Sequence, residues 1–418
     1  MNNPLYLGLD FGTSGARAVV IDAQGQIIVQ AHCSYDIADW HSWLRALYWL
    51  CASLPAPLRR RLAAIAIDGT SASVLLCDAR NVPLAPPLLY HHAHAADQVK
   101  NITAHAPIGH TAACATSSLA KLLHLLQPPA TKRARYFSDQ ASWLAAMLTG
   151  QPGISDHHNS LKLGYDVETL AWPAWISALG VDAWLPTVVP PGTVLGQLAP
   201  TVAVKLDLPA ACVVRAGTTD SIAAFIASGA RQPGTAVTLL GSTLVLKLLS
   251  TQRVEDARYG VYSHRFGDLW LAGGASNSGG AVLRQFFDDA ALATLSLQIK
   301  PTHASGLDYY PLPTRGERFP VNDPQLAPRI TPRPASDALF LHGLLEGIAG
   351  IEAGAYALLA ELGATPLTRV LTAGGGAQNT TWTAIRRRLL GVPVLTAAHD
   401  AAAYGAACLA KNGLDFLH

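Results

Sequence analysis

The sequence predicts an α/β protein made of two related lobes. A chain of 418 residues is longer than one hydrophobic core usually supports, so two compact parts are expected. Half of the residues are hydrophobic and 14% are charged, which indicates a large buried interior. A pattern of strand, small-residue turn and strand at the amino terminus recurs after Gly229. We therefore expect one lobe over residues 1–228 and a second over residues 229–400.

The first lobe is predicted to open with a three-stranded meander. Apolar runs at residues 5–10, 16–22 and 26–32 are separated by the turns Gly12-Thr13-Ser14-Gly15 and Asp22-Ala23-Gln24-Gly25. Apolar spacing then predicts further elements in the order helix 43–52, strand 62–67, strand 74–77, helix 118–126, helix 141–147, strand 212–216 and helix 221–228. The proline- and glycine-rich stretch 186–200 is expected to be a connection over the surface.

The second lobe is predicted to repeat this arrangement. Strands at 236–240 and 244–249 flank the turn Gly241-Ser242-Thr243, and helices at 280–287 and 339–362 follow. A strand at 370–372 then leads into Gly374-Gly375-Gly376. The same order, a meander followed by helices, is predicted in both halves of the chain. This repetition suggests two lobes with related folds.

Composition excludes several classes of protein. The net charge is +2 with no basic stripe, so no nucleic-acid partner is expected. The amino terminus lacks the pattern of a signal peptide, and no uninterrupted apolar run reaches the ~18 residues of a membrane span. The six cysteines are scattered without metal or disulfide spacing, as in a reducing compartment. We expect a soluble cytoplasmic protein (or one of the plastid stroma), monomer or homodimer.

Four turns of small residues each follow a predicted strand. Glycine and hydroxyl residues let backbone N–H groups converge on an anion, and two such turns can hold the phosphates of a nucleotide. Each turn alone could serve hairpin geometry only. No Walker A or dinucleotide fingerprint accompanies them. The four together favour a phosphate site; they are Asp10-Phe11-Gly12-Thr13-Ser14-Gly15, Gly217-Thr218-Thr219-Asp220, Gly241-Ser242-Thr243 and Gly374-Gly375-Gly376-Ala377-Gln378-Asn379.

This ordered set, with Arg17 and Ala402-Ala403-Tyr404-Gly405-Ala406-Ala407, resembles the FGGY carbohydrate kinases over nearly the whole chain. The resemblance implies two RNase H-like lobes of the actin, Hsp70 and sugar kinase superfamily with a central cleft, and residues 401–418 packed back on the first lobe. It is greatest for the short D-ribulose kinases (xylulose-kinase-like) of cyanobacteria and plants. The stretches that carry this likeness are Asp68-Gly69-Thr70-Ser71, Thr116-Ser117-Ser118-Leu119-Ala120-Lys121 and Ser305-Gly306-Leu307-Asp308-Tyr309-Tyr310-Pro311.

The resemblance also assigns roles to individual residues. Asp220 matches the base that accepts the proton of the attacking sugar hydroxyl. Asp10 matches an aspartate that contacts Mg²⁺, often through water, and the sugar. ATP is implied as cofactor, with the sugar also contacted by Gly69 and Ser71, and the nucleotide by Gly12, Thr13, Ser14, Gly241, Ser242, Thr243, Gly375, Gly376 and Asn379.

Physical chemistry agrees with a catalytic Asp220. Phosphoryl transfer needs positioning and charge neutralisation, with a carboxylate orienting the nucleophile. Asp220 precedes a predicted helix, whose positive end favours the ionised carboxylate. The alternative is an ordinary helix N-cap, which is the commoner use of aspartate at such a position. Asp10 has a similar alternative as a turn former.

Three features depart from the FGGY pattern. Residues 384–391 replace the usual Gln-x-x-Ala-Asp and glycine, which puts the surface contacts of that helix in doubt. Asp400 stands where glutamate is typical, and the chain is shorter than typical pentulose and glycerol kinases. A missing loop would bear most directly on sugar specificity.

Other clusters are given structural interpretations. The histidines His91, His92 and His94, and the pair His157 and His158, are expected at the surface or beside a site rather than on a metal. Trp382 could cover a purine or pack in the core. A charged surface loop is expected at Arg315, Glu317 and Arg318.

The predicted function is transfer of the ATP γ-phosphate to a terminal hydroxyl of a ketopentose, D-ribulose first. One alternative keeps the kinase and changes the acceptor to D-xylulose, L-ribulose or glycerol. Another is an actin-like ATP-binding regulator that phosphorylates no sugar.

Overall fold

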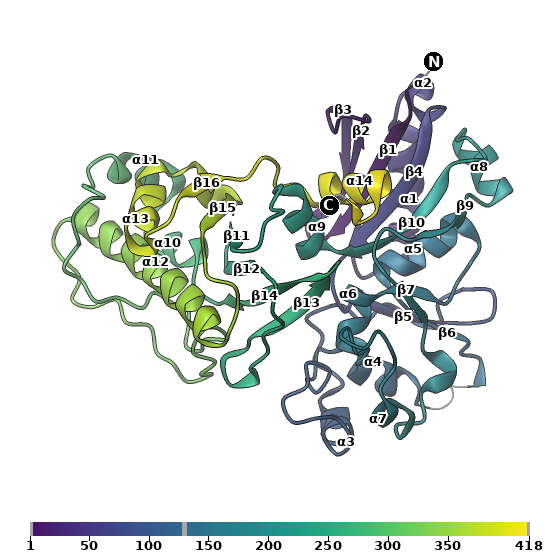
Figure 1. The fold of residues 1–418 in the computed structure, drawn as a ribbon, viewed down its shortest axis with the longest axis horizontal. Coiled ribbons are helices and arrows are strands. Elements are labelled where there is room, and N and C mark those ends of the chain that lie inside the picture. The colour runs from purple at the N-terminus through teal and green to yellow at the C-terminus, as the bar shows by residue number, and fades with distance from the viewer. Residues whose placement is uncertain (1–2, 128–131, 416–418) are drawn as a thin grey trace. The chain divides into compact units, whose positions relative to one another are not determined.

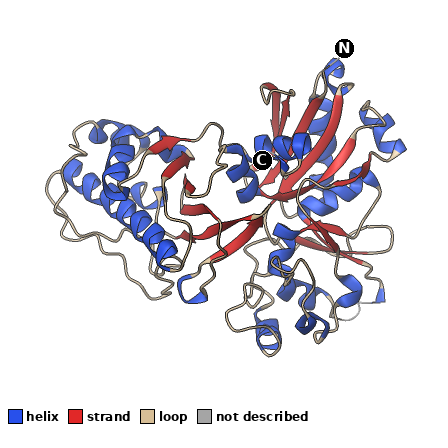
Figure 2. Cartoon of the chain, viewed as in Figure 1, coloured by secondary structure: helices blue, strands red, loops and turns tan. Residues whose placement is uncertain are grey.

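The computed structural model describes residues 3–127 and 132–415. The chain folds into two compact units (Figure 1). Unit 1 comprises Met1–Ala227 and Ala401–His418, and unit 2 comprises Ser228–Asp400. Each unit contains a six-stranded sheet with helices packed on it (Figure 2), which confirms the predicted α/β class with two lobes.

The main sheet of unit 1 has the strand order β3-β2-β1-β4-β10-β9. β1 pairs antiparallel with β2 and parallel with β4, and β10 continues the parallel part. Alternate side chains of β2 enter different clusters: Ala18 and Val20 join the main core, whereas Val19 and Ile21 face the carboxyl-terminal helix. The strands are β1 (Leu5–Gly12), β2 (Gly15–Ile21), β3 (Ile27–Cys33), β4 (Leu62–Gly69), β9 (Val194–Gln197) and β10 (Val213–Thr219).

Helices and two small sheets complete unit 1. The pairs β5 (Val74–Cys77) with β6 (Tyr136–Asp139), and β7 (Ile154–Asp156) with β8 (Thr187–Val189), stand outside the main sheet. A second hydrophobic cluster forms around β5, β6 and α4. The helices are α1 (Trp40–Ser53), α2 (Ala56–Arg59), α3 (Val99–Thr103), α4 (Ser118–Leu125), α5 (Gln140–Thr149), α6 (His157–Ser160), α7 (Ala174–Ser177), α8 (Pro200–Leu206), α9 (Asp220–Ala227) and α14 (Ala402–Asn412).

The late helix α14 belongs to unit 1 and lies directly against its first strand. A Cβ on Gly8 of β1 would lie 2.0 Å from the carbonyl oxygen of Ala403. A Cβ on Gly405 would lie 1.8 Å from the carbonyl oxygen of Ala223 in α9. Backbone therefore meets backbone at both places, which only glycine permits. Figure 1 shows this helix in yellow beside the purple first strands.

The sheet of unit 2 has the strand order β13-β14-β12-β11-β15-β16. β11 pairs antiparallel with β12 and parallel with β15. The part β14-β12-β11-β15-β16 repeats the arrangement β3-β2-β1-β4-β10 of unit 1: three antiparallel strands followed by two parallel ones. The strands are β11 (Thr235–Leu240), β12 (Leu244–Ser250), β13 (Tyr262–Phe266), β14 (Leu269–Ser276), β15 (Arg369–Ala373) and β16 (Val394–Thr396).

A long helix, α12 (Asp337–Glu361), forms the centre of the unit 2 core. Its apolar residues, Leu344 and Ile348 among them, pack in one cluster with Leu246 of β12 and Val370 of β15. By length and composition it could cross a membrane, yet 56% of its most apolar stretch is buried inside the protein. We therefore describe it as a core helix. The other helices are α10 (Gly280–Leu283), α11 (Asp289–Ser296) and α13 (Thr380–Leu390).

A fully buried ion pair links α12 to α13. Arg386 Nε and Nη2 donate to the two carboxylate oxygens of Glu352 at 2.6 and 2.7 Å. Thr238 Oγ1 also donates to Glu352, and Arg386 Nη1 donates to Thr372 Oγ1 at 2.7 Å. The stretch that departs from the FGGY pattern thus places an arginine in the core at Arg386.

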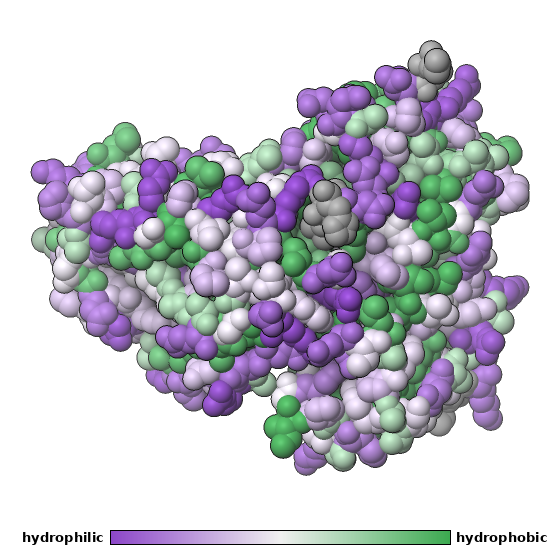
Figure 3. All heavy atoms as spheres, viewed as in Figure 1, coloured by the Kyte–Doolittle hydropathy of each residue, from purple (hydrophilic) through white to green (hydrophobic). Residues whose placement is uncertain are grey.

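Hydrophobic and hydrophilic residues are interspersed on the face drawn in Figure 3. The most exposed large hydrophobic residues, Ile108, Val204 and Leu297, come from separate segments. Scattered apolar residues of this kind are normal for a surface in contact with water.

Some predicted elements were wrong. The stretch 186–200 is more than a connection, because it contains β8 and the sheet strand β9. The helix expected over 280–287 is limited to α10, and β13, β14, β16, α11 and α13 were not predicted. Strands 5–10, 16–22, 26–32 and 74–77 were placed to within two residues.

Candidate active site

Three aspartates of unit 1 gather at the carboxyl ends of neighbouring parallel strands. Asp10 of β1 and Asp68 of β4 occupy paired positions in the sheet. Thr218 of β10 pairs with Asp68, and Asp220 follows directly as the first residue of α9. Ligands of α/β sheets commonly bind at this edge. Strand order therefore brings together two predicted site residues, Asp10 and Asp220, and adds a third acid.

The Asp10 and Asp68 carboxyl groups are almost inaccessible to water, with Asp10 3% and Asp68 0% exposed. Burial raises the pKa of Asp68 well above its usual range, and the neighbouring Asp10 raises it further. Burial also raises the pKa of Asp10, against the opposing effects of Asp68 and Arg17. Arg17 Nη1 lies 3.1 Å from Asp10 Oδ2. The favoured state has the proton on Asp68 and the charge on Asp10.

Asp220 differs from these two because its side chain is only partly buried. Its Oδ1 accepts the backbone N–H of Ser221 at 2.6 Å. Asp220 follows β10, and Gly217 within that strand allows it to approach β4 closely. A Cβ on Gly217 would lie 1.7 Å from the carbonyl oxygen of Ile67. Asp220 is thus a partly accessible carboxylate at a helix start, fixed against the sheet.

The first predicted phosphate turn is the hairpin between β1 and β2. Gly12 pairs with Gly15, and Thr13 and Ser14 form the exposed tip. Arg17 Nη2 donates to Ser14 Oγ at 3.4 Å, so this guanidinium contacts both Asp10 and the tip.

The loop after β4 holds the predicted sugar residues Gly69 and Ser71. Gly69 is buried and Ser71 is partly exposed. The backbone of this loop is tied down by a buried lysine: Lys121 Nζ donates to the carbonyl oxygens of Ala72 and Leu89, each at 2.7 Å. Burial lowers the pKa of Lys121 to about 7.

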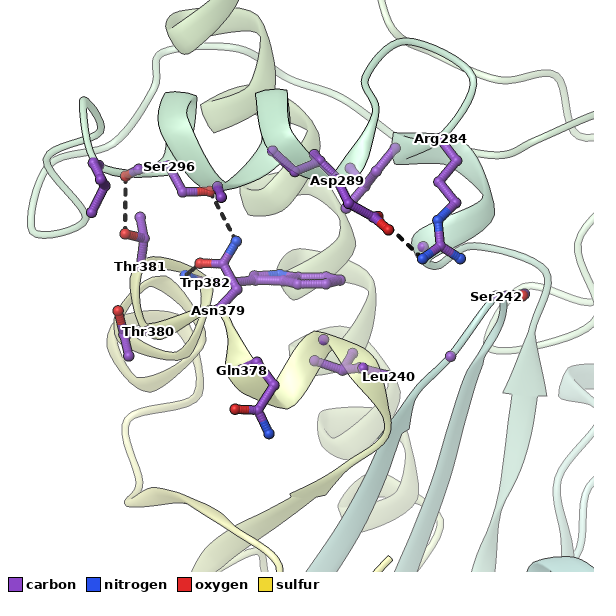
Figure 4. Close-up of a pocket in the computed structure, with 18 residues that line it drawn as sticks. Leu240, Ser242, Arg284, Asp289, Ser296, Gln378, Asn379, Thr380, Thr381 and Trp382 are labelled. Carbon is purple, nitrogen blue, oxygen red and sulfur yellow. Dashed lines mark hydrogen bonds and ion pairs between the residues drawn. The ribbon is translucent and has the colours of Figure 1, made fainter. Parts of the chain in front are cut away.

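Unit 2 contains a cavity of about 800 Å³ next to its glycine turns (Figure 4). Gly241, Ser242, Gly375, Gly376 and Asn379 all line it, as predicted for nucleotide contacts, while Thr243 does not. Its other walls come from α10 and the residue after it, from α11, from the turn Gly375–Gln378 and from α13. The residues there that were not predicted are Gly280, Leu283, Arg284, Asp289, Leu292, Ser296, Gln378, Thr380 and Thr381. The volume suits a ligand of nucleotide size.

The glycines shape this cavity by close packing. A Cβ on Gly376 would lie 2.7 Å from Cβ of Leu240, just before the Gly241 turn. Gly280 N–H donates to Gly241 O and Ala281 N–H to Ser242 O, which fixes the turn to α10. Side chains at these glycines would fill the space or displace the turn.

Asn379 and Trp382 both line the cavity and stabilise the structure around it. The side chain of Asn379 caps α13 by accepting Trp382 N–H at 2.9 Å, and its Nδ2 donates to Ser296 Oγ (Figure 4). Trp382 is 3% exposed, lines the cavity and donates its indole N–H to Leu345 O. Trp382 therefore packs in the core and also lines the cavity, while its contact with a purine stays a prediction.

Glu317 corrects the expected surface loop. It is buried and accepts hydrogen bonds from Ser276 Oγ, the N–H of Asn277 and the N–H of Arg318. Arg315 and Arg318 are exposed, as expected. The carboxylate holds the end of β14, which leads to Gly279 and Gly280 beside the Gly241 turn.

The histidine clusters have different environments. His92 and His94 stack at 5.0 Å on a partly exposed loop, in line with a surface role. His157 and His158 are buried, and His158 Nδ1 lies 2.7 Å from Thr218 Oγ1, two residues before Asp220. Within residues 3–127 and 132–415, no three His, Cys, Asp or Glu side chains form a group that could hold a metal ion.

Two family models together match nearly the whole chain. Residues 5–227 match the N-terminal domain of the FGGY family of carbohydrate kinases, and residues 236–412 match its C-terminal domain. The chain therefore belongs to the FGGY family. It is an ATP-dependent carbohydrate kinase with the two-lobed α/β fold of that family.

Relatives of known name agree with this assignment. The chain is 29% identical over 440 residues to a xylulose kinase of Streptomyces coelicolor, covering 98% of this chain and 88% of the relative. It is 20% identical to a gluconokinase of Bacillus subtilis, covering 82% and 67%. The crystal structure of a xylulose kinase from Brucella ovis superposes with a TM-score of 0.86 at 24% identity, covering 98% and 90%.

Proposed function

We propose that this kinase transfers the γ-phosphate of ATP to a terminal hydroxyl of a ketopentose, with Asp220 as the base. The observation that carries this proposal is the cluster of Asp10, Asp68 and Asp220 at the ends of three parallel strands. Asp220 alone among them is partly accessible, so it suits a group that must meet a substrate hydroxyl.

Asp10 is proposed to take part in binding Mg²⁺ with the nucleotide. Its carboxylate is an oxygen ligand of the kind Mg²⁺ prefers, and one protein carboxylate with phosphate oxygens and water is a common arrangement. Mg²⁺ would neutralise charge on the phosphates during transfer.

ATP is proposed to bind in the cavity of unit 2. Gly241 and Ser242 would receive phosphates, and Gly375, Gly376 and Asn379 the adenosine part. The Gly12-Thr13-Ser14 turn of unit 1 would contribute the second set of phosphate contacts. Thr243 of unit 2 does not line the cavity, so any contact it makes would be indirect. Gly69 and Ser71 would contact the sugar.

Two ketopentoses are the leading acceptors. D-Ribulose is implied by the resemblance of Asp68-Gly69-Thr70-Ser71 and Thr116-Ser117-Ser118-Leu119-Ala120-Lys121 to the short D-ribulose kinases. D-Xylulose is favoured by the names of several relatives, which are xylulose kinases at low identity. A cytoplasmic location stays a prediction.

A product assay tests the function. Purified protein with Mg²⁺ and ATP is given D-ribulose, D-xylulose, L-ribulose, gluconate or glycerol, and ADP release and the phosphorylated product are measured. We expect one of the first two to exceed the other acceptors in kcat/KM by at least about tenfold, because sites that hydrogen-bond a substrate discriminate strongly. ATP binding with no phosphorylated product from any acceptor would favour the regulator instead.

A further inference from the structure

A chain of buried hydrogen bonds in unit 1 connects the predicted phosphate turn to the predicted sugar loop. At the centre of this chain of hydrogen bonds is Gln140, the first residue of α5, whose side chain is fully buried. Its Oε1 accepts the N–H and the hydroxyl of Thr70 at 3.1 and 3.0 Å. Its Nε2 donates to the Tyr35 hydroxyl at 3.3 Å, which in turn donates to Gly12 O at 2.7 Å.

The direction of every bond in this chain is fixed by chemistry. A backbone N–H can only donate, so the amide atom of Gln140 that faces Thr70 must be oxygen. The nitrogen then faces Tyr35 and can only donate, which leaves the phenol proton for the carbonyl of Gly12. At the other end, Thr70 gives its one hydroxyl proton to Gln140. Ser73 Oγ, 2.5 Å away, must then donate to Thr70 while accepting Tyr90 N–H.

Both ends of the chain lie on backbone that has little room to move independently. A Cβ on Gly69 would lie 3.0 Å from Gln140 Oε1, so the residue before Thr70 packs on the same amide. The Tyr35 ring packs edge-on against Phe11, next to Gly12, with ring centroids 5.6 Å apart. A shift of either loop therefore displaces the Gln140 amide or the Tyr35 hydroxyl.

The phenol proton is retained under working conditions. Burial raises the pKa of Tyr35, and the nearby carboxylates of Asp10, Asp220 and Asp68 raise it further. Because Tyr35 stays protonated, its bond to Gly12 O persists across the pH range in which a kinase is assayed.

We infer that Gln140 and Tyr35 are positioning residues that couple nucleotide binding at the Gly12 turn to acceptor binding at the Gly69–Thr70 loop. This inference rests on the proposed function of both loops. Occupation of the Gly12 turn orders its carbonyl, and the ordered Tyr35–Gln140 pair presents Thr70 in one position. The acceptor then binds a loop that is already ordered, and linkage requires the reverse effect to be equal.

Tyr35→Phe tests the coupling, because it removes one oxygen and keeps the ring. Calorimetry gives the Kd of D-ribulose and of D-xylulose with and without adenylyl imidodiphosphate and Mg²⁺. We expect the wild-type protein to bind the acceptor at least about fivefold more tightly with nucleotide. The ratio of interest is the acceptor Kd without nucleotide divided by the Kd with nucleotide. Tyr35→Phe should reduce this ratio by about two- to tenfold, which corresponds to the free energy that one or two buried hydrogen bonds usually contribute. Each Kd measured alone should change by less than the ratio does.

Two comparisons separate coupling from general damage. Tyr48→Phe changes the same functional group on α1, where the ring lies 3.9 Å from Lys205 Nζ, and should leave the ratio unchanged. Gln140→Met removes the hydrogen bonds of Gln140 to both Thr70 and Tyr35. In the folded variant, nucleotide should no longer change the Kd of the acceptor, so the ratio of the two Kd values should fall to about one. A purely structural role for Tyr35 would lower the melting temperature and leave the ratio at its wild-type value, which would overturn the inference.

A second measurement does not depend on the sugar. Hydrogen exchange of the segment containing Thr70 should slow when adenylyl imidodiphosphate is added to the wild-type protein, and not in Tyr35→Phe. Unchanged exchange in the wild-type protein would also overturn the inference. Failure of both ketopentoses to bind would refute the proposed acceptors instead, while this exchange experiment still decides the coupling.

Discussion

Each unit buries a cluster of charged side chains, and the two clusters differ in how charge is balanced. In unit 2, Glu352 accepts hydrogen bonds from Arg386 and Thr238, and Arg386 also donates to Thr372. In unit 1, the half-exposed Arg17 is the cation paired with Asp10, and the fully buried Asp68 forms no ion pair among the described residues.

This difference indicates that the cluster in unit 2 stabilises the fold, whereas the cluster in unit 1 belongs to the proposed site. A buried pair with matched hydrogen bonds needs nothing further, so it fixes the packing of α12 on α13. A buried carboxyl group without a paired cation costs free energy of folding, and such groups are common at functional sites. The proposed reactive groups therefore belong to unit 1, whereas unit 2 contains a cavity next to a charge-balanced core.

The largest effect is expected from Asp220→Asn. It keeps the shape of the side chain and removes its ability to accept a proton, so kcat with the preferred ketopentose should fall about 10²- to 10⁴-fold. ATP affinity by calorimetry should stay within about twofold of the wild-type protein, since the cavity of unit 2 is unchanged. Asp268→Asn, in an exposed turn, is the control. Full turnover by Asp220→Asn would refute its role as base.

The balanced cluster should respond in stability. Arg386→Met leaves Glu352 buried without its cation, so the free energy of unfolding should drop by about 3–5 kcal/mol in urea titrations. The double variant Arg386→Met with Glu352→Leu should recover much of this loss, because no isolated charge remains. A single variant within about 1 kcal/mol of the wild-type protein would show that the pair is not the anchor described above.

A third buried acid makes unit 1 sensitive to pH. Burial raises the pKa of Asp156 to about 7, with nearby Asp139 adding to the shift. The native state keeps a proton that the unfolded chain loses near its ordinary pKa of about 4. The contribution of Asp156 to stability is therefore complete below pH 4 and lost as pH rises through about 7.

Asp156→Asn checks this sign. Unfolding free energies measured by urea titration from pH 4 to 8 should decline less steeply in the variant, by on the order of 2 kcal/mol over the range. The two proteins are compared by how steeply the unfolding free energy changes with pH. Asp156 Oδ1 also accepts the N–H groups of His158 and Asn159 as a helix cap, and replacing it by Asn changes stability at every pH. An identical slope in both proteins would contradict the assignment.

The smallest effect is expected from an exposed pair. Arg333 and Asp337 lie 3.0 Å apart with about half of each side chain exposed. Asp337→Asn should change the free energy of unfolding by no more than about 0.5 kcal/mol, since water and salt screen such pairs. A loss comparable with that of Arg386→Met would show that burial is not what distinguishes the two pairs.

The parts of the fold that depend on local signals were predictable. Alternating apolar residues and glycine turns located β1, β2, β11 and β12 and the turns between them, because those signals lie within a few residues. β9 was missed because a short edge strand inside a stretch rich in proline and glycine has no distinct local pattern. β13 and β14 form a hairpin with the two-residue turn Gly267-Asp268, a local signal that the prediction overlooked.

Candidate site residues could be named where a motif contained them, and their roles stay predictions. Asp10, Asp220 and the glycines that line the cavity stood in recognisable turns. Asp68 was read only as part of a motif, although an acid directly after a buried run, as at Asp10, was a signal for it. Gln140 and Glu317 carried no such signal, because their importance arises from partners about 70 and 40 residues away.

The placement of α14 has a consequence for the order in which the protein matures. This helix packs on β1 at Gly8 and on α9 at Gly405, yet the ribosome makes it after the whole of unit 2. Unit 2 is continuous in sequence and can fold as soon as Asp400 has emerged. The unit synthesised first is therefore finished last, and until α14 arrives one face of its sheet must remain uncovered or be shielded by a chaperone.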